Sequence, residues 1–383
     1  MSEPGLGIRG PWGRETLLER IGTAVTQDRL PQSLLLRGPA GTQKRELALW
    51  VGALLQCAEP GPRGPCRRCR SCRLAERLEH PDIHLHFPMP RPKRASSREK
   101  LREAIESQRL ARLAELREDP DGTLDEEAVT GIYLAAIENV RSQAARRPAM
   151  GRRVVFVIEE ADRMVPQSSS PEAANAFLKL LEEPPDYAYL LLTSSRPEAL
   201  LPTIRSRTAS LRLPPLPEDR VLEYLADSLD AEGERALAVA RRAEGAVGRA
   251  RRLWSSDDEA ARETADRLLR AALTGSPRAR HLAASRFSAR GARATLLPAL
   301  EELRTRLRDL LCLAAGAGDR GLDSGAIRTM LGDRHIEPER VLDAFGAVDE
   351  ALDGTSRNLN PQSTVAVLLR KLGRALARAD RAA

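Results

Sequence analysis

Aromatic residues, lysines and long apolar runs are all scarce in this sequence. Aromatic residues make up 3% of the 383 residues, too few for the stacking surfaces on which single-strand nucleic-acid binders hold successive bases. No uninterrupted apolar run approaches the ~20 residues that a membrane-spanning helix requires, and no apolar segment follows a basic start at the N-terminus. We therefore expect a soluble, cytoplasmic protein that neither crosses a membrane nor reads exposed bases.

Lysine is the scarcest charged residue, although the chain as a whole is basic. Lys and Arg together number 61 against 54 Asp and Glu, for a formal net charge of +7, and only five of the 61 are lysines. A bias of this kind is typical of genome composition, so an arginine is interpreted as functional only where a motif surrounds it. The positive charge permits contact with nucleic acid without requiring it, and the length predicts two or three domains of roughly 150 residues each.

Cysteine is also rare, but four of the five cysteines fall in one run with the spacing C-x8-C-x2-C-x2-C. They are Cys57, Cys66, Cys69 and Cys72. C-x2-C steps let thiolates converge on one tetrahedral Zn²⁺ at ~2.3 Å, and in a reducing compartment such clusters indicate metal rather than disulfides. Four protein ligands leave no open position for a substrate, so we predict a structural zinc site. His80, His84 and His86 follow with the alternation of a strand, and we interpret them as strand residues rather than ligands.

Short apolar runs alternate with amphipathic segments through the first 213 residues. The alternation predicts a doubly wound α/β domain, in which helices cover a parallel sheet. A highly charged segment over about 88–122 is interpreted as an insertion. Within it a loose helical period predicts a mobile helix, and the residues that keep this period are Leu101, Ile105, Leu110, Leu113 and Leu116. The predicted strands lie at 33–37, 82–87, 153–158 and 187–193, and the predicted helices at 14–29, 124–145 and 171–183.

Beyond the proline-rich stretch Pro214–Pro217 the sequence predicts helices only. These helices form two groups, separated by a break rich in glycine, serine and proline. The chain is therefore divided into an α/β domain over 1–213, with the cysteine module at 57–72 and the charged insertion inside it, a small helical domain over 214–258, and an all-α domain over 259–383.

The first predicted strand runs into a degenerate phosphate-binding loop, Gly38-Pro39-Ala40-Gly41-Thr42-Gln43-Lys44-Arg45. The pattern G-x-x-x-x-G-K-[ST] needs a glycine before the lysine, where this chain has Gln43, and a hydroxyl for Mg²⁺ after it, where this chain has Arg45. Both changes oppose nucleotide binding. We expect no ATP at the chain's own site, and we interpret Gly38, Gly41 and Lys44 as a remnant of the fold.

A second nucleotide-related segment follows the strand at 153–158. Glu159 stands where the metal-holding aspartate of a Walker B motif is expected, and Glu160 stands at the position of the base. A longer carboxylate could still reach Mg²⁺ through water, so this change alone would only weaken hydrolysis. Together with the altered loop, it indicates a protein that has lost ATPase activity.

Several stretches match, in order and spacing, the AAA+ family of bacterial DNA polymerase III clamp-loader subunits. The chain resembles this family nearly throughout, except for the charged insertion. The resemblance implies an AAA+ domain, with a P-loop NTPase-like parallel sheet and a zinc knuckle, followed by a helical lid and an all-α collar that forms the oligomer. The matching stretches are GPAGTQKR, the cysteine module, VVFVIEEADRM, NAFLKLLEEPP at 175–185, LLTSSRPEALLPTIRSRT at 191–208, GAVGRARRL at 245–253 and Asn358-Leu359-Asn360-Pro361.

The resemblance also implies roles for single residues. Thr193 matches the sensor-1 position, and Arg249 resembles sensor 2, which has only a structural role where no nucleotide binds. Ser206 and Arg207 match the Ser-Arg-Cys motif, with Thr208 in place of the cysteine. In the family this arginine is a finger offered in trans to ATP on a neighbouring subunit. The alternative for Arg207 is a solvated structural arginine.

The function implied is that of a stator, a subunit that catalyses nothing by itself. It would close a pentameric ring with the gamma/tau ATPase and delta subunits, complete one motor's ATP site, and contact the sliding clamp and primer-template DNA through the complex. Its cofactor would be structural zinc. Two alternatives stay open: the gamma/tau motor subunit itself, and a zinc-knuckle nucleic-acid binder with a decayed ATPase fold.

Overall fold

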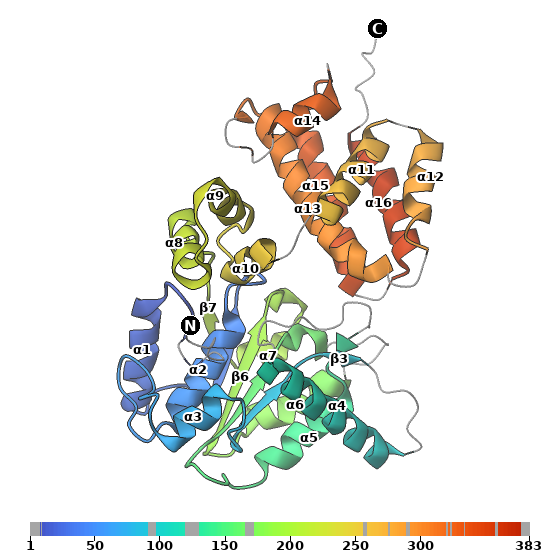
Figure 1. Ribbon diagram of the computed structural model, residues 1–383. Coiled ribbons are helices and arrows are strands. Elements are labelled where there is room, and N and C mark those ends of the chain that lie inside the picture. Colours follow the sequence, from blue (N-terminus) through green and yellow to red (C-terminus); the bar gives the residue numbers. More distant parts are fainter. Residues whose placement is uncertain are drawn as a thin grey trace. The chain divides into compact units, whose positions relative to one another are not determined.

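The computed structural model describes most of the chain, and within it two compact units can be distinguished (Figure 1). Among the described residues, the first unit runs to Arg251 and the second begins at Arg252. No helix in these parts of the chain is both long and apolar enough to cross a membrane. The described residues are 8, 10–90, 97–118, 130–164, 172–255, 259–274, 276–288, 292–318, 321, 324–332, 334–356 and 359–376.

The first unit contains a five-stranded sheet with the strand order β2-β5-β6-β1-β7, and every pairing in it is parallel. This confirms the predicted parallel α/β core. The central strands β5 and β6 are buried along their whole length, because helices cover both faces of such a sheet. The strands are β1 (Ser33–Arg37), β2 (Ile83–His86), β5 (Val154–Ile158), β6 (Ala188–Ser194) and β7 (Ala209–Arg212).

Four of these strands were predicted within one or two residues, and β7 was not. The sequence of β7 is ASLR, and three of its four residues are exposed. A short edge strand of this kind carries little apolar patterning, so its place in the sheet comes from hydrogen bonds to β1 rather than from burial.

The parallel order brings the carboxyl ends of β1, β5 and β6 to one edge of the sheet. In the register, Leu36 lies beside Thr193 and Ile158 beside Leu192. The phosphate-type loop, Glu159 and Thr193 follow or end these three strands, so the topology gathers the predicted site residues at one place.

Helices surround the sheet (Figure 1). The helix after the phosphate-type loop, α2, packs against β1, β5 and β6 and is buried over most of its length, with Trp50 fully enclosed. The helices of the first unit are α1 (Glu15–Thr26), α2 (Lys44–Gln56), α3 (Arg70–Glu76), α4 (Arg98–Glu118), α5 (Leu134–Ala144), α6 (Glu172–Glu182), α7 (Pro202–Ser206), α8 (Glu218–Leu229), α9 (Gly233–Arg242) and α10 (Val247–Ser255), with short 3-10 turns η1 (Ala161–Met164) and η2 (Pro197–Ala199).

The charged insertion differs from its prediction as a mobile helix. Its helix α4 packs on α5 and buries Ile105, Leu113 and Leu116. Arg109, 6% exposed, donates from Nη1 to the Leu85 carbonyl on edge strand β2 at 3.2 Å. The insertion therefore covers a sheet edge, which natural proteins protect in this way.

The segment after the insertion also differs from its prediction. The structure has a strand, β4 (Thr130–Gly131), paired antiparallel with β3 (Met89–Pro90), where a helix over 124–145 was expected. The helix α5 begins only at Leu134, and positions 124–129 lie outside the described residues. Thr130, Gly131 and Ile132 are all buried, and a short apolar run of this kind fits either type of element.

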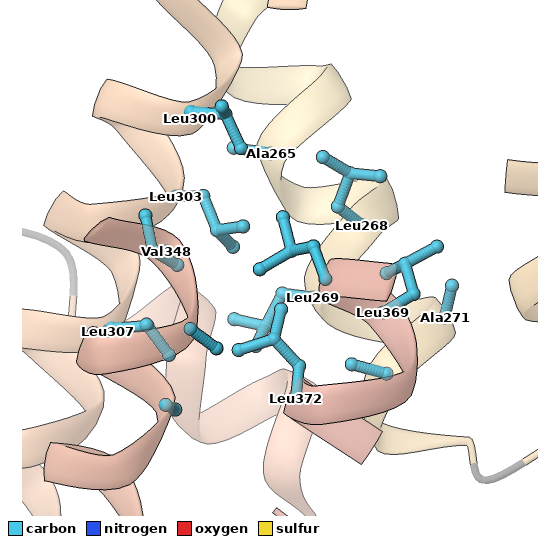
Figure 2. Packing of buried hydrophobic residues seen from close by; sticks show 14 of the residues in the cluster. Ala265, Leu268, Leu269, Ala271, Leu300, Leu303, Leu307, Val348, Leu369 and Leu372 are labelled. Atoms are coloured by element: carbon cyan, nitrogen blue, oxygen red, sulfur yellow. The ribbon is translucent and has the colours of Figure 1, made fainter. Parts of the chain in front are cut away.

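The second unit consists only of helices in its described parts, as predicted. Leucines of α11, α13 and α16 form its core together with Val341 and Val348 of α15, and Figure 2 shows Leu303, Leu307 and Leu369 converging there. The helices are α11 (Glu259–Leu273), α12 (Pro277–Ser285), α13 (Ala292–Ala314), α14 (Ser324–Leu331), α15 (Pro338–Ser356) and α16 (Pro361–Ala375). The boundary of a separate lid domain stays a prediction, since residues 214–251 belong to the first unit.

Candidate functional site: a self-occupied phosphate loop and an exposed arginine

Gln43, in place of the glycine, is the residue that begins α2. Its backbone has a φ of 62°, in the left-handed region that the glycine would favour. Its side chain turns away from the loop, and Oε1 accepts a hydrogen bond from the backbone N–H of Trp12 at 3.0 Å. The Trp12 indole in turn donates to the Arg220 carbonyl of α8 at 3.3 Å and packs edge-on against Tyr224. Gln43 thus ties the loop to the N-terminal segment, which contacts α8.

Lys44 keeps the position of the phosphate-binding lysine but bonds to its own loop. Its Nζ donates to the carbonyls of Gly38 at 2.8 Å and Pro39 at 2.6 Å, and the side chain is 7% exposed. Burial lowers the pKa of Lys44 to about 8, against the attraction of nearby carboxylates, chiefly Glu160. In this structure, the ammonium group that would meet a β-phosphate is bound to backbone oxygens.

Arg45 stands where a Mg²⁺-binding hydroxyl is expected, and it pairs with the Walker B carboxylate. Its Nε forms a short ion pair with Glu159 Oε1, and its Nη2 donates to Oε2 at 3.1 Å. The carboxylate raises the pKa of Arg45 above its ordinary value. Burial raises the pKa of Glu159, an effect that Arg45 opposes. The two residues expected at either side of a metal ion are thus bonded directly to each other.

A segment at the start of α10 closes the loop from a further side. Gly248 donates from its backbone to the Gly41 carbonyl at 2.9 Å. Gly41 has a φ of 77°, and a methyl group on it would lie 3.0 Å from the backbone nitrogen of Arg249. The Arg249 guanidinium donates to Glu244 Oε2 at 3.2 Å. The sensor-2-like segment therefore packs on the loop backbone at van der Waals distance.

Thr193 and Glu160, which the resemblance places at the sensor-1 and base positions, lie together. Thr193, 3% exposed, accepts the backbone N–H of Glu160 at 3.1 Å through Oγ1. Glu160 has a φ of 44°, and its carboxylate pairs with Arg163 at 2.7 Å. Next to them, Ser194 donates to Asp162 at 2.7 Å. These contacts join the end of β6 to the segment that follows β5.

Arg207 lies on another part of the surface, directly after α7. Its side chain is 36% exposed, with Nη1 donating to the Thr203 carbonyl at 3.1 Å and Nη2 2.9 Å from Glu182 Oε1. Ser206 also bonds to the Thr203 carbonyl, at 3.1 Å. Thr208, the replacement for cysteine, is buried and donates to the Ile204 carbonyl at 3.1 Å. A cation held at the surface in this way can reach a ligand on another molecule.

The four cysteines of the module lie together. Their sulfur atoms are all within 4.8 Å of one another, which is compatible with four ligands around one ion and could hold a metal. Cys57 ends α2, Cys69 begins α3, and Cys72 lies within α3. The end of α2, the start of α3 and the segment between them therefore bring the four sulfur atoms together.

Backbone N–H groups point at the sulfur atoms, as expected for thiolates. Cys66 donates to Cys57 Sγ at 3.2 Å, and Cys72 donates to Cys69 Sγ at 3.4 Å. Burial opposes ionisation of Cys66, but N–H groups of Arg68 and Cys69 outweigh it and lower the pKa of Cys66 to about 6. Burial raises the pKa of Cys57 and Cys72. A bound cation would lower both, because a coordinating thiol is deprotonated.

The three histidines after the cluster lie outside this group, as predicted. His84 stacks on Phe156 of β5 with the ring centres 5.0 Å apart, and burial lowers its pKa to about 4. His86 is buried, and burial lowers its pKa well below the ordinary value. His80 accepts the Asp82 N–H at 3.1 Å. All three are neutral packing residues of the β2 region.

Two residues of these sites were not predicted, Trp12 and Glu182. Trp12 contacts the loop from 31 positions away, and its only signal is that it is one of three tryptophans in an aromatic-poor chain. Glu182 belongs to the stretch NAFLKLLEEPP, which matches the family, but the match by itself implies no role for the acidic residues. That stretch is the signal that could have marked it.

Comparison with known proteins identifies the class. Residues 13–217, just over half of the chain, match the family described as DNA polymerase III, delta subunit. The chain belongs to this family. The DNA polymerase III subunit delta' of Pseudomonas aeruginosa is 29% identical over 227 residues, which is 59% of this chain and 55% of the relative. That of Escherichia coli is 27% identical over 254 residues, 66% of this chain and 63% of the relative.

Part of the chain is also similar in sequence to a second kind of subunit. The DNA polymerase III subunit gamma/tau of Mycobacterium tuberculosis is 34% identical over 94 residues, 24% of this chain and 15% of the relative. The matches to the delta' subunits therefore confirm the resemblance predicted from the motifs. They span about half to two thirds of the length of those relatives.

Proposed function

We propose that the chain is a stator of the delta' type in a DNA polymerase III clamp loader. It would have an AAA+ domain and a helical lid and collar, and would assemble with gamma/tau and delta subunits. It would bind no ATP itself. Arg207 would act as a finger on the ATP of the neighbouring motor, so that the complex loads a sliding clamp onto primer-template DNA. By itself the chain would be an accessory subunit rather than an enzyme.

The observation that carries the proposal is the phosphate loop filled by its own side chains. Gln43, Lys44 and Arg45 each bond to protein groups, and Arg45 lies against the carboxylate that would hold Mg²⁺. A nucleotide would have to break the bonds of Lys44 to the Gly38 and Pro39 carbonyls, and a Mg²⁺ ion would have to part the Arg45–Glu159 pair. The loss of the loop's chemistry, combined with an exposed arginine at the finger position, supports a subunit that acts on its neighbour's nucleotide.

The same observation argues against the gamma/tau alternative. A motor subunit needs a hydroxyl for Mg²⁺ after the lysine, and a guanidinium at that position repels the metal. For the nucleic-acid-binder alternative, the knuckle carries Arg67, Arg68, Arg70 and Arg73 but lacks the aromatic side chains on which bases stack. We propose that the cysteine cluster binds zinc, because four thiolates that close together favour Zn²⁺.

The proposal is tested by replacing Arg207 with alanine in the complex reconstituted with its motor and delta subunits. We expect normal assembly by size-exclusion chromatography and a loss of ATP turnover at the one site that the finger serves, about 10³-fold at that site. The matched control is Arg205→Ala, which removes an exposed arginine of α7 two positions away.

Two outcomes would contradict the proposal. If the Arg207→Ala complex hydrolysed ATP and loaded the clamp like wild type, Arg207 would have no role in the mechanism. If the chain alone hydrolysed ATP in the presence of Mg²⁺, the gamma/tau interpretation would replace the stator interpretation.

A further inference from the structure

The carboxylate beside Arg207 comes from a different helix. Glu182 is the last residue of α6, and two prolines, Pro184 and Pro185, follow and prevent the helix from continuing. Arg207 is the residue that ends α7. The Nη2–Oε1 distance of 2.9 Å therefore joins the carboxyl ends of two helices through one side-chain pair.

Both partners of this pair are accessible. The Arg207 side chain is 36% exposed and that of Glu182 is 47% exposed. An exposed pair contributes little to folding, because solvent screens it and two long side chains must be ordered to form it. Its geometry therefore matters more for where the guanidinium is held than for the stability of the fold.

The guanidinium is left with free donors. It carries five N–H groups, and in the described part of the chain one bonds to the Thr203 carbonyl and one nitrogen faces Glu182. These two contacts use one donor on each terminal nitrogen. The remaining N–H groups can donate to oxygen atoms of a phosphate, which a guanidinium binds in a forked geometry.

We propose that Glu182 is a positioning residue for Arg207, whose guanidinium it holds in place at the surface before the neighbouring nucleotide arrives. This inference rests on the proposed function of Arg207. Without Glu182, the Arg207 side chain would sample several rotamers. The entropy lost on ordering it would then add to the activation free energy of ATP hydrolysis. The Thr203 carbonyl alone fixes only one nitrogen and allows rotation about it.

The test is a double-mutant cycle on ATP turnover by the reconstituted complex. Glu182→Ala, Arg207→Ala and the double variant are compared, with Glu183→Ala as control, because Glu183 is the adjacent exposed glutamate and lies outside the pair. We expect Glu182→Ala to lower kcat at that site about two- to fivefold, in the range of an exposed ion pair, with KM for ATP unchanged. Glu182→Gln, which retains an acceptor oxygen, should recover part of the loss.

The double variant separates positioning from a general structural effect. If Glu182 acts through Arg207, its removal should change nothing further once Arg207 is alanine. A loss of equal size in both backgrounds, or a Glu182→Ala complex indistinguishable from Glu183→Ala, would overturn the inference while leaving Arg207 as the finger. If Arg207→Ala itself had no effect, the proposed function and this inference would both fall.

Discussion

Three consecutive residues, Gln43 to Arg45, account for the altered chemistry of the phosphate loop. Lys44 and Arg45 bond to protein groups where the phosphate-loop pattern would bond to nucleotide and metal, whereas Gln43 bonds to Trp12 outside the loop. The Arg45–Glu159 pair is the strongest of these, since it brings opposite charges together at a site where Glu159 is 5% exposed. An internal cation thus neutralises a buried carboxylate, as a metal ion would.

Removing Arg45 should therefore destabilise the first unit. Arg45→Ala leaves Glu159 buried without its cation, and we expect a loss of about 2 kcal/mol in the free energy of unfolding. This is less than the 3–5 kcal/mol typical of a broken buried pair, because the guanidinium is itself about one-third exposed. Urea titration measures the loss, and the double variant Arg45→Ala/Glu159→Gln should recover part of it by removing the stranded charge.

The control for this prediction is an exposed ion pair of the same unit. Arg241 pairs with Glu218 at 3.1 Å, with both side chains about half exposed. Arg241→Ala should change the free energy of unfolding by less than about 0.5 kcal/mol. Equal losses for Arg45→Ala and Arg241→Ala would show that the buried Arg45–Glu159 pair stabilises the fold no more than an exposed pair does.

At this scale the sequence predicted residue types better than partners. The mismatches at Gln43 and Arg45 were visible from a motif of eight residues, because the pattern names what each position must do. That Arg45 bonds to a residue 114 positions away, or Gln43 to Trp12, depends on how strands are ordered in the sheet. Neither pairing leaves a periodic signal in the chain.

Among the elements, α4 shows how composition can mislead. Its charged sequence predicted a mobile helix in an insertion, yet a narrow stripe of residues along it is buried and the helix packs on α5. The period that marked Ile105, Leu113 and Leu116 was correct, whereas Leu110 of the same pattern is 54% exposed. The stripe is narrower than the sequence alone indicated.

Two substitutions on α4 test whether it belongs to the core. Ile105 is 1% exposed, and Ile105→Ala should lower the free energy of unfolding by about 2–4 kcal/mol through lost burial and the cavity left behind. Leu110→Ala on the same helix should change it by less than about 0.5 kcal/mol. Urea titration of both variants measures this, and equal small effects would mean that α4 is only loosely attached.

The strands show the opposite limit of sequence patterns. β1, β5 and β6 were predictable because they are apolar runs buried in a parallel sheet, and β2 was predictable from its alternating pattern. β7 and the small β3–β4 pair were not, because each is short and is stabilised by hydrogen bonds to a neighbour rather than by its own apolar pattern. Whether such short segments form strands depends on the neighbouring strand with which they pair in the folded protein.

For the whole molecule, the division into two units has a thermodynamic consequence. Each unit has a hydrophobic core of its own, and the core residues of the second unit all lie after Arg252 in the chain. The cysteine cluster belongs to the first unit. A ligand that binds the native state of one unit stabilises that unit by mass action and leaves an independent unit unchanged.

Removal of the metal should therefore affect one unit only. Calorimetry of the metal-loaded chain should show two transitions, and a chelator should lower the midpoint of one of them while the other stays in place, because the thiolates at the α2–α3 junction would lose the ion that joins them. Metal analysis of the same protein should give about one zinc per chain. Cys72→Ser should lose the zinc and lower the same midpoint as the chelator does. Cys312→Ser changes the half-buried fifth cysteine, outside the cluster, and should retain the zinc and both wild-type midpoints. A chelator that moved neither transition, or both equally, would contradict a structural zinc confined to the first unit.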